Sequence, residues 1–390
     1  MDGQSTRIAV DEAQDDDRID AALAVLRPRF AARASAYDRS GEIAFDNLAE
    51  LREAGLLALA LPRAHGGRAI GLRRISTIVA DVARGDPSTA LILAMQYLQS
   101  GSVGRSTAWN EAVKAELFAS IRDEGALVNA LRVEPELGTP ARGGLPATRV
   151  GLHDGVWRLN GCKIFSTGSE ALGWGVVWAA TDEASPRVGQ VLVRLDRPGV
   201  RIERSWNQLG MRATGSHTIH FENVEIPARW LVNLNRPDAA PGEELSAAFE
   251  STIAIAALYD AIAREARDWL VGFLKARTPS NLGAPLATLP RFRSLLGEID
   301  ALLLANEAQL EFAYQRDDSG RGLGADALLV KHNVTEAAID AVGRAVAAIG
   351  NPALNLDNPL ERHYRNVLCG RIHTPQGDAV LAAAGARALG

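Results

Sequence analysis

Residues 209–227 read LGMRATGSHTIHFENVEIP, and this stretch is the clearest guide to how the middle of the chain folds. Its first half is rich in Gly, Ser and Thr, which are typical of turns at the end of a strand. Its second half alternates apolar residues such as Ile219 and Phe221 with polar ones, the pattern of a strand with one buried face. The stretch therefore predicts a turn that leads directly into a half-buried strand.

Similar short segments surround it and predict a β-domain over about 125–235. They are rich in Val, Ile, Trp and Thr and are separated by turn residues. Asp154-Gly155 lies between two alternating segments and predicts a tight hairpin. The segments read ALVNALRV, VWRLNGCKIFSTG, WGVVWAAT and GQVLVRLDRPGVRI.

Both flanks of this β-domain have the apolar spacing of amphipathic helices. The predicted helical stretches are 19–26, 47–56, 76–84, 86–104, 246–275, 292–315 and 335–349. An order of helices, strands and helices, with no helix inside the β-domain, predicts an α+β protein that is mainly α. The strands would form a small barrel or sandwich carried by a helical scaffold.

Composition excludes several classes of protein. The chain has 390 residues, a net charge of −5 and 23% charged residues, so nothing indicates a nucleic-acid surface. Two distant cysteines argue against a disulfide framework, and no signal-like or membrane-spanning apolar run is present. We expect a cytoplasmic protein without membrane contact. No metal motif occurs, because His217 and His220 would face opposite sides of one strand.

Three loops of the β-domain share one chemical feature, small or hydroxyl residues at the end of a strand. They lie in residues 131–140 (LRVEPELGTP), 159–169 (LNGCKIFSTGS) and 209–227 (LGMRATGSHTIHFENVEIP). Each alone is ordinary turn chemistry. Together they could supply the polar rim that a flat heteroaromatic cofactor needs.

The ordered set of motifs resembles the acyl-CoA dehydrogenase superfamily. The resemblance rests on LREAGLLALALPRAHGG, VARGDPSTAL, NGCKIFSTG, LGMRATGSHTIHFENVEIP and NPLERHYRN, and it extends over nearly the whole chain. It implies an N-terminal helical domain (1–122), a central flavin-binding β-barrel (123–236) and a C-terminal four-helix bundle (237–390). It also implies a homotetramer, a dimer of dimers, assembled around flavin.

The resemblance assigns a flavin site residue by residue. The positions that would contact the ring are Leu131, Arg132, Val133, Thr139, Phe165, Ser166 and Thr167. Arg132-Val133 replaces the usual Val-Thr pair, so one hydroxyl contact is lost or replaced. Arg277 and Asn351 occupy positions that hold the FAD pyrophosphate, but their surrounding motifs differ from the family pattern. The flavin is therefore expected to be FAD or FMN, in a form that a separate reductase could supply reduced.

The family's catalytic base is absent from its usual place. In dehydrogenases a Glu followed by Gly-Thr lies nine residues after an Arg that corresponds to Arg365. That position is Thr374 here, and a hydroxyl cannot act as a base near neutral pH. Branched-chain members carry the Glu on the first long C-terminal helix, where Ser251 aligns. Glu250 is one residue away and about 100° round the helix.

His373 immediately precedes the missing base, in the segment 362–378, RHYRNVLCGRIHTPQGD. The pattern His373-Thr374-Pro375 resembles the flavin-dependent monooxygenase branch, which includes dibenzothiophene monooxygenase and two-component hydroxylases. The resemblance implies that His373 faces the flavin and governs proton delivery, as an imidazole titrating near neutrality would. The alternative is a histidine that caps the helix C-terminus or binds a backbone carbonyl.

The sequence thus leaves three functions to compare. The first is a two-component monooxygenase using reduced flavin and O₂ on a small aromatic, sulfur-containing or amine substrate. The second is an acyl-CoA dehydrogenase with Glu250 as a displaced base. The third is a non-catalytic flavin-binding homologue. Gln96, Tyr97 and Tyr259 are the expected substrate contacts. The substrate, the reductase, the choice of flavin and the binding of any acyl-CoA stay open.

The segment 297–313, GEIDALLLANEAQLEFA, predicts assembly through the C-terminal bundle. Its apolar residues, Ile299, Leu302, Leu303, Leu304 and Leu310, cover more of the helix circumference than a simple core-facing stripe does. A second apolar face usually packs against another subunit. Arg277 would then lie near a neighbouring subunit's flavin. The alternative is that residues 278–290 fold back over this face.

Overall fold

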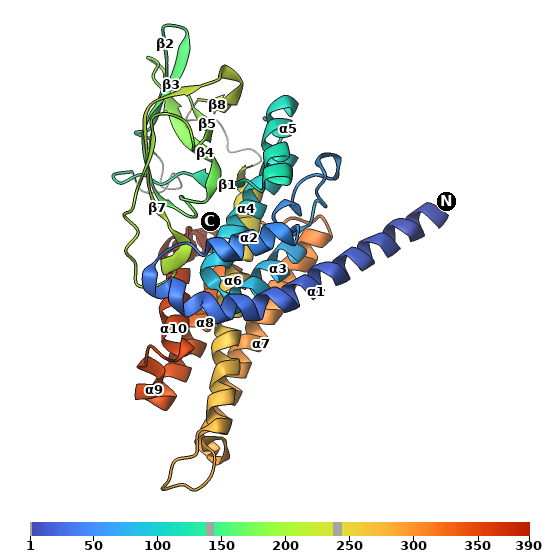
Figure 1. Ribbon diagram of the computed structural model, residues 1–390, viewed down its shortest axis with the longest axis vertical. Helices are drawn as coiled ribbons and strands as arrows, with labels where there is room; N and C mark the ends of the chain where they lie inside the picture. Colours follow the sequence, from blue (N-terminus) through green and yellow to red (C-terminus); the bar gives the residue numbers. More distant parts are fainter. Residues whose placement is uncertain (1, 138–143, 237–243) are drawn as a thin grey trace.

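The computed structural model describes residues 2–137, 144–236 and 244–390, and it has the predicted α+β class (Figure 1). Helices from both ends of the chain form one block, and the strands lie together beside it. The long helix α1 crosses the block, and its N-terminal end projects away from the rest of the molecule.

The N-terminal helices are built around a buried α4. Asp86 caps α4 by accepting hydrogen bonds from the backbone N–H groups of Ser88 and Thr89, and Pro87 occupies the first helical position. The helix α1 is one continuous element through Pro28, much longer than the predicted 19–26. The bounds are α1 Asp2–Ser40, α2 Phe45–Glu53, α3 Leu72–Gly85, α4 Pro87–Arg105 and α5 Glu111–Ala119, followed by a π-turn at Ser120–Glu124.

The strands form a single mixed sheet in the order β6-β7-β3-β2-β4-β5-β8, with β1 paired to β4. The predicted hairpin is confirmed, because Asp154 and Gly155 join β2 to β3 with positive φ angles of 49° and 80°. The bounds are β1 Leu127–Leu131, β2 Arg149–His153, β3 Val156–Ser166, β4 Leu172–Thr181, β5 Val188–Arg194, β6 Val200–Glu203, β7 His217–Ile226 and β8 Leu231–Asn235.

The C-terminal helices pack both on one another and on α3 and α4. Arg84 of α3 bonds to Glu265 of α6 at 3.0 Å, and Arg73 of α3 bonds to Glu311 of α7 at 2.6 Å, so the two helical regions are joined. The bounds are α6 Glu244–Ala276, α7 Pro290–Asp318, α8 Asp326–Ile349, α9 Asn351–Leu354, α10 Pro359–Leu368 and α11 Gly377–Leu389, with a 3₁₀ turn η8 at Cys369–Arg371.

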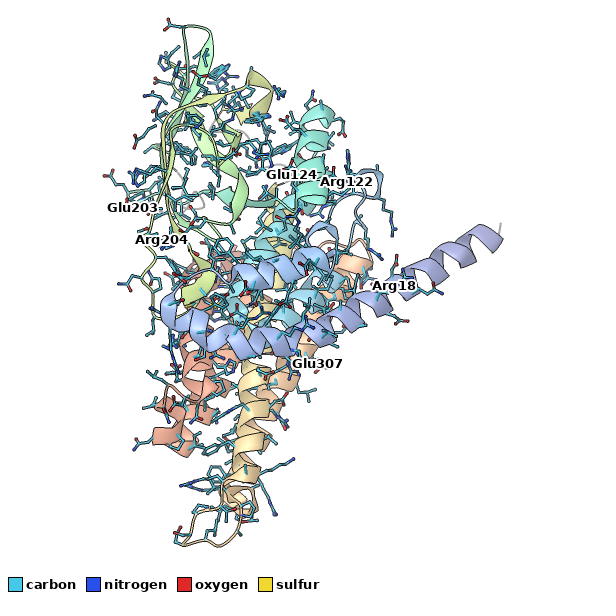
Figure 2. The ribbon with its side chains drawn as sticks, viewed as in Figure 1. Arg18, Arg122, Glu124, Glu203, Arg204 and Glu307 are labelled. Atoms are coloured by element: carbon cyan, nitrogen blue, oxygen red, sulfur yellow. The ribbon has the colours of Figure 1, made fainter. Side chains whose placement is uncertain are left out.

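Charged side chains on the described surface point outward, as Arg18 on α1, Arg204 after β6 and Glu307 on α7 illustrate (Figure 2). No helix within the described residues is long and apolar enough to cross a membrane. The same part of the chain contains no group of three His, Cys, Asp or Glu side chains placed to hold a metal ion.

Candidate functional site

A buried ion pair holds the ends of β1 and β3 side by side. Lys163 Nζ lies 2.6 Å from a carboxylate oxygen of Glu134, and both side chains are almost wholly buried. The carboxylate also accepts hydrogen bonds from the backbone N–H groups of Ala147 (2.6 Å) and Thr148 (3.0 Å). Burial opposes the charged form, but the Lys163 hydrogen bond and these other donors lower the pKa of Glu134 below its ordinary value.

The pair brings together two of the segments that the sequence assigned to flavin. Residue Ile164 donates its backbone N–H to the Val133 carbonyl at 2.9 Å, beside the ion pair. Residues 131–133 therefore run next to the 165–167 turn. Leu131 is buried, whereas Arg132 is exposed and lies over the Trp178 ring with its guanidinium carbon 5.3 Å from the ring centroid.

The turn after β3 presents an aromatic face beside a row of hydroxyl groups. Phe165 has a positive φ of 56° and leaves 55% of its surface exposed, with its ring edge-on to Trp206. Thr167 Oγ1 lies 3.0 Å from Ser216 Oγ, which lies 2.8 Å from Thr214 Oγ1. Ser166 is buried in the same turn. This edge has both the open ring surface and the hydroxyl groups that a flat cofactor requires.

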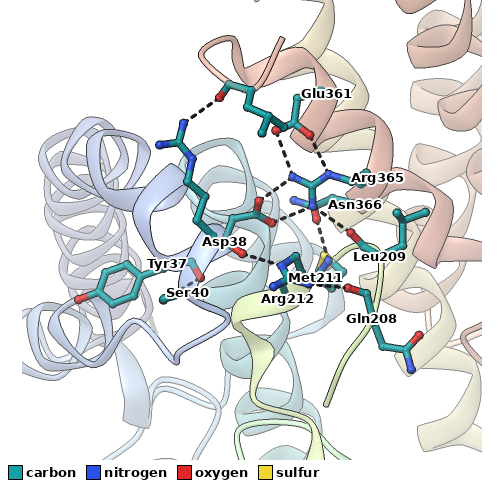
Figure 3. A network of polar contacts seen from close by, with 12 residues as sticks. Tyr37, Asp38, Ser40, Gln208, Leu209, Met211, Arg212, Glu361, Arg365 and Asn366 are labelled. Atoms are coloured by element: carbon teal, nitrogen blue, oxygen red, sulfur yellow. Dashed lines mark hydrogen bonds and ion pairs between the residues drawn. The ribbon is translucent and has the colours of Figure 1, made fainter. Parts of the chain in front are cut away.

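The turn before β7 docks tightly on α10 (Figure 3). Met211 donates its backbone N–H to Asn366 Oδ1 at 2.7 Å, and Arg365 donates to the Leu209 carbonyl at 2.9 Å. Arg365 also binds Asp38 at 2.6 Å and Glu361 at 2.7 Å, so it joins α1, α10 and the sheet. A Cβ atom at Gly210 would lie 2.2 Å from the Arg365 carbonyl oxygen, so this approach requires glycine.

Contacts continue from this docking point to His373. The Cys369 thiol lies close to the Gly210 backbone N–H and donates to the Arg365 carbonyl at 3.7 Å, and burial raises the pKa of this thiol to about 11. Gly370 packs against Tyr259 of α6, and the Tyr259 and His373 ring centroids are 5.6 Å apart. The Tyr259 hydroxyl is buried with no hydrogen-bond partner in the described structure. A buried hydroxyl without a partner indicates a position where a bound molecule or water would donate or accept.

The imidazole of His373 does not titrate near neutrality, so that expectation is wrong. Burial, with a smaller contribution from the positive charge of Lys331, lowers the pKa of His373 to about 4. The side chain is therefore uncharged at pH 7. A neutral imidazole can donate a hydrogen bond from one nitrogen and accept one at the other, which suits a group that orients a proton.

Glu250 makes its contacts away from the His373 loop. Its carboxylate is bonded to Arg105 at the end of α4. Burial raises the pKa of Glu250, Arg105 opposes this shift, and the like charge of Asp317 on α7 adds to it. The raised pKa would suit a base, but the ion pair with Arg105 occupies the carboxylate.

Gln96 and Tyr97 are buried and satisfied by backbone groups. The Gln96 side-chain oxygen accepts from Val128 N at 2.7 Å, and its amide donates to Leu57 O at 3.3 Å. The Tyr97 hydroxyl donates to Leu56 O at 2.5 Å. These bonds attach α4 to its neighbours, so both residues have a structural role here.

The other predicted flavin-site residues lie apart from the contacts that run from the 209–211 turn to His373. Arg277 is exposed at the end of α6, and Asn351 is exposed at the start of α9, both on the side of the bundle far from the sheet (Figure 1). Within one chain they do not meet the 165–167 turn. Thr139 lies outside the described residues.

Sequence reasoning missed Lys163, Ser216 and Lys331 as members of the site. Their signals were present but weak. Lys163 lies at a buried position of a strand, and Lys331 interrupts the apolar face of a helix in LLVKHNV. A lysine on a buried face needs a partner, but the sequence alone does not say which.

Comparison with known proteins assigns the family. Models of the acyl-CoA dehydrogenase N-terminal, middle and C-terminal domains match residues 14–118, 132–224 and 250–377. A putative acyl-CoA dehydrogenase of Bacillus subtilis, YdbM, is 34% identical over 361 residues, covering 91% of this chain and 92% of the relative. The chain belongs to the acyl-CoA dehydrogenase family. The resemblance stated from the motifs is thereby confirmed.

Two further proteins that are similar to this chain carry names other than acyl-CoA dehydrogenase. L-evernosamine nitrososynthase of a Micromonospora species is 28% identical and covers 90% of this chain and 85% of its own. The structure of KijD3 in complex with FMN and an amino-keto sugar nucleotide superposes with a TM-score of 0.83 at 26% identity. That match covers 95% of this chain and 93% of KijD3.

Proposed function

We propose that this family member is a two-component flavin-dependent monooxygenase acting on a small organic substrate. The observation that carries the proposal is the position of His373, with its ring against Tyr259, on the loop where dehydrogenases have a glutamate. Thr374, at the glutamate position itself, has no basic group. Glu250, the other candidate base, is bound to Arg105. Neither of these two positions therefore offers a free carboxylate for proton removal from the alpha carbon of an acyl-CoA.

The residues around the 165–167 turn fit a flavin ring. Phe165 offers an exposed aromatic face, and Thr167 and Ser216 offer hydroxyl groups at one edge. The segment 131–133 would flank the ring from β1, held there by the Glu134–Lys163 pair. Reduced flavin, when bound, supplies the electrons that activate O₂. KijD3, at 26% identity, was crystallised with FMN, which supports flavin binding by this chain as well.

The chain's own groups would control protons. His373 in its neutral form would donate a hydrogen bond to an oxygen atom at the reacting centre, or accept a proton from the substrate. Tyr259, whose hydroxyl has no partner in the described structure, would hold a polar group of the substrate. A separate reductase would supply the flavin, because the segments around Arg277 and Asn351 differ from the family's pyrophosphate-binding motifs.

We expect the variant His373→Ala to shorten the delay before reduced, flavin-loaded protein returns to the oxidised spectrum after mixing with O₂. The delay should fall about 100-fold, because a positioned proton-transfer group contributes rate factors of this order. Stopped-flow absorbance measures it. His332→Ala is the matched control, since His332 contacts Gly377 on the same loop and should leave the delay unchanged.

Reoxidation without any delay in the unmodified protein would contradict the proposal. Anaerobic bleaching of bound flavin by an acyl-CoA, lost in Glu250→Gln, would instead support the dehydrogenase that the name of the Bacillus subtilis relative suggests. A folded oligomer that binds neither FMN nor FAD in either redox state would support a non-catalytic homologue.

We also propose a homotetramer built through the C-terminal bundle. Leu304 and Phe312 of α7 are exposed, at 66% and 46%. A separate groove of about 650 Å³ on the same bundle is lined by residues that include Leu302, Ile339 and Tyr364 of α7, α8 and α10. Residues 278–290 form a loop at the far tip of α6 and α7 and leave Leu304 uncovered (Figure 1). The exposed apolar side chains of α7 support a second subunit packed against this helix.

Light scattering at micromolar concentration should therefore give about four times the 41.6 kDa of one chain. Leu304→Glu should lower the measured mass, because it places a charge on the apolar face. Leu152→Glu, at an exposed leucine of β2, should leave the mass unchanged. A single-chain mass for the unmodified protein would refute the assembly.

A further inference from the structure

Lys331 is buried in an unusual environment. Its ammonium group donates to the carbonyl oxygens of His373 at 2.8 Å and Pro375 at 3.3 Å, and only 2% of the residue is exposed. No carboxylate in the described structure lies within ion-pair distance of it. Lys163, the other lysine buried to this degree, has Glu134 at 2.6 Å. Burying a cation among neutral groups costs free energy, so a buried lysine normally has an acidic partner.

The charged groups around the loop do not offset the free-energy cost of burying the Lys331 cation. Glu336, five residues further on α8, is bonded to Arg371 of η8 at 2.6 and 2.8 Å. Burial lowers the pKa of Lys331 to about 8, and the attraction of Glu336 only partly opposes it. His332 lies on the other side of the loop, against Gly377. From α6 and η8 the loop meets the Tyr259 ring and the Cys369 backbone carbonyl, while the Cys369 thiol donates to the Arg365 carbonyl.

We propose that Lys331 is a positioning residue that anchors the backbone of the His373 loop and brings its positive charge close to the imidazole. Both effects come from one group. Two hydrogen bonds to carbonyls two residues apart fix the backbone that carries the imidazole, which keeps the ring against Tyr259. The positive charge disfavours a second cation on the ring. A part for the loop in the reaction rests on the proposed function, whereas the anchoring of the loop by Lys331 does not.

The anchor should weaken in alkaline solution. Below pH 8 the ammonium group is charged, and charge-assisted hydrogen bonds are about twice as strong as neutral ones. As the pH rises through about 8, Lys331 loses its proton and the bonds to the two carbonyls weaken. The His373 imidazole is already neutral throughout this range, so its own titration does not contribute.

Nuclear magnetic resonance of ¹⁵N-histidine protein, without added flavin, tests both effects. His373→Asn identifies the His373 signal among seven histidines. In Lys331→Met we expect the His373 pKa to rise by about one unit, a tenfold change in its protonation equilibrium. Lys331→Arg, which keeps the charge, should restore the low value. Lys114→Met, at a buried lysine bound to Glu111, should leave His373 unchanged.

Hydrogen exchange of the backbone N–H groups of residues 372–374, 376 and 377 in the unmodified protein gives a second measurement that does not require the variant to fold. After correction for intrinsic rates, protection should fall about tenfold between pH 7 and pH 9. Unchanged protection over this range, or an unchanged His373 titration in a folded Lys331→Met, would overturn the proposal. If these results appear as expected while the oxygen reaction shows no delay, Lys331 retains its role and the monooxygenase proposal alone fails.

Discussion

Replacing Lys163 by Met should lower the free energy of unfolding by about 4 kcal/mol, the typical cost of removing one partner from a buried ion pair. The cost arises because Glu134 keeps its charge in a site from which water is excluded. Urea denaturation measures it. Arg187→Met, which breaks an exposed pair with Glu183, should cost at most about 1 kcal/mol.

The double variant Lys163→Met/Glu134→Gln should recover part of the loss. It removes the unpaired charge, and the glutamine oxygen can still accept from Ala147 or Thr148. A double variant no more stable than Lys163→Met would contradict this explanation and indicate that packing of the lysine stem dominates.

The same carboxylate gives a pH dependence with a defined sign. The pKa of Glu134 is lower in the folded protein than its ordinary value of about 4.3, so its ionised form stabilises the fold. This stabilisation is fully present above that ordinary value and is lost as the pH falls through the folded pKa. The stability difference between the unmodified protein and Glu134→Gln should therefore shrink in acid.

The second large effect is expected at Arg365. Its replacement by Met should cost about 3 kcal/mol, because Asp38 and Glu361 lose the cation between them and are themselves largely buried. The Leu209 carbonyl also loses its donor. Arg371→Met is the control, since its pair with Glu336 is much more exposed and should contribute about 1 kcal/mol or less.

The Arg365 variant should also weaken flavin binding, because the turn at 209–211 would lose part of its anchor on α10. Fluorescence titration with FMN measures this. A variant that loses stability but binds FMN as before would mean that Met211 and Asn366 hold the turn without Arg365.

Local patterns predicted the elements of the fold well, and long-range pairing poorly. The Asp154-Gly155 hairpin was predictable because turn residues act on their immediate neighbours. The parallel pairing of β1 and of β2 with β4 was not, because nothing in either segment names its partner. The extent of α1 was also missed, because its charged N-terminal part lacks an apolar stripe and Pro28 argued for a break.

The candidate site, too, could be predicted from the sequence only in part. Phe165, Ser166 and Thr167 could be located from turn chemistry and resemblance, and the structure places them beside residues 131–133. The protonation of His373 could not be foreseen, because burial and a cation 42 residues earlier in the chain determine it. The rotation between neighbouring residues of a helix predicted that Glu250 would point away from the loop. The ion pair between Glu250 and Arg105 could not be predicted.

The docking of the 209–211 turn on α10 has a thermodynamic consequence. The 209–211 turn, which leads into the sheet, and the His373 loop are both attached to the segment that runs from Arg365 to Thr374, through Asn366 and Cys369. Their separation is therefore set during folding, before any ligand arrives. A molecule that binds beside them would not have to spend binding energy on ordering these two segments, so less conformational entropy would be lost on association.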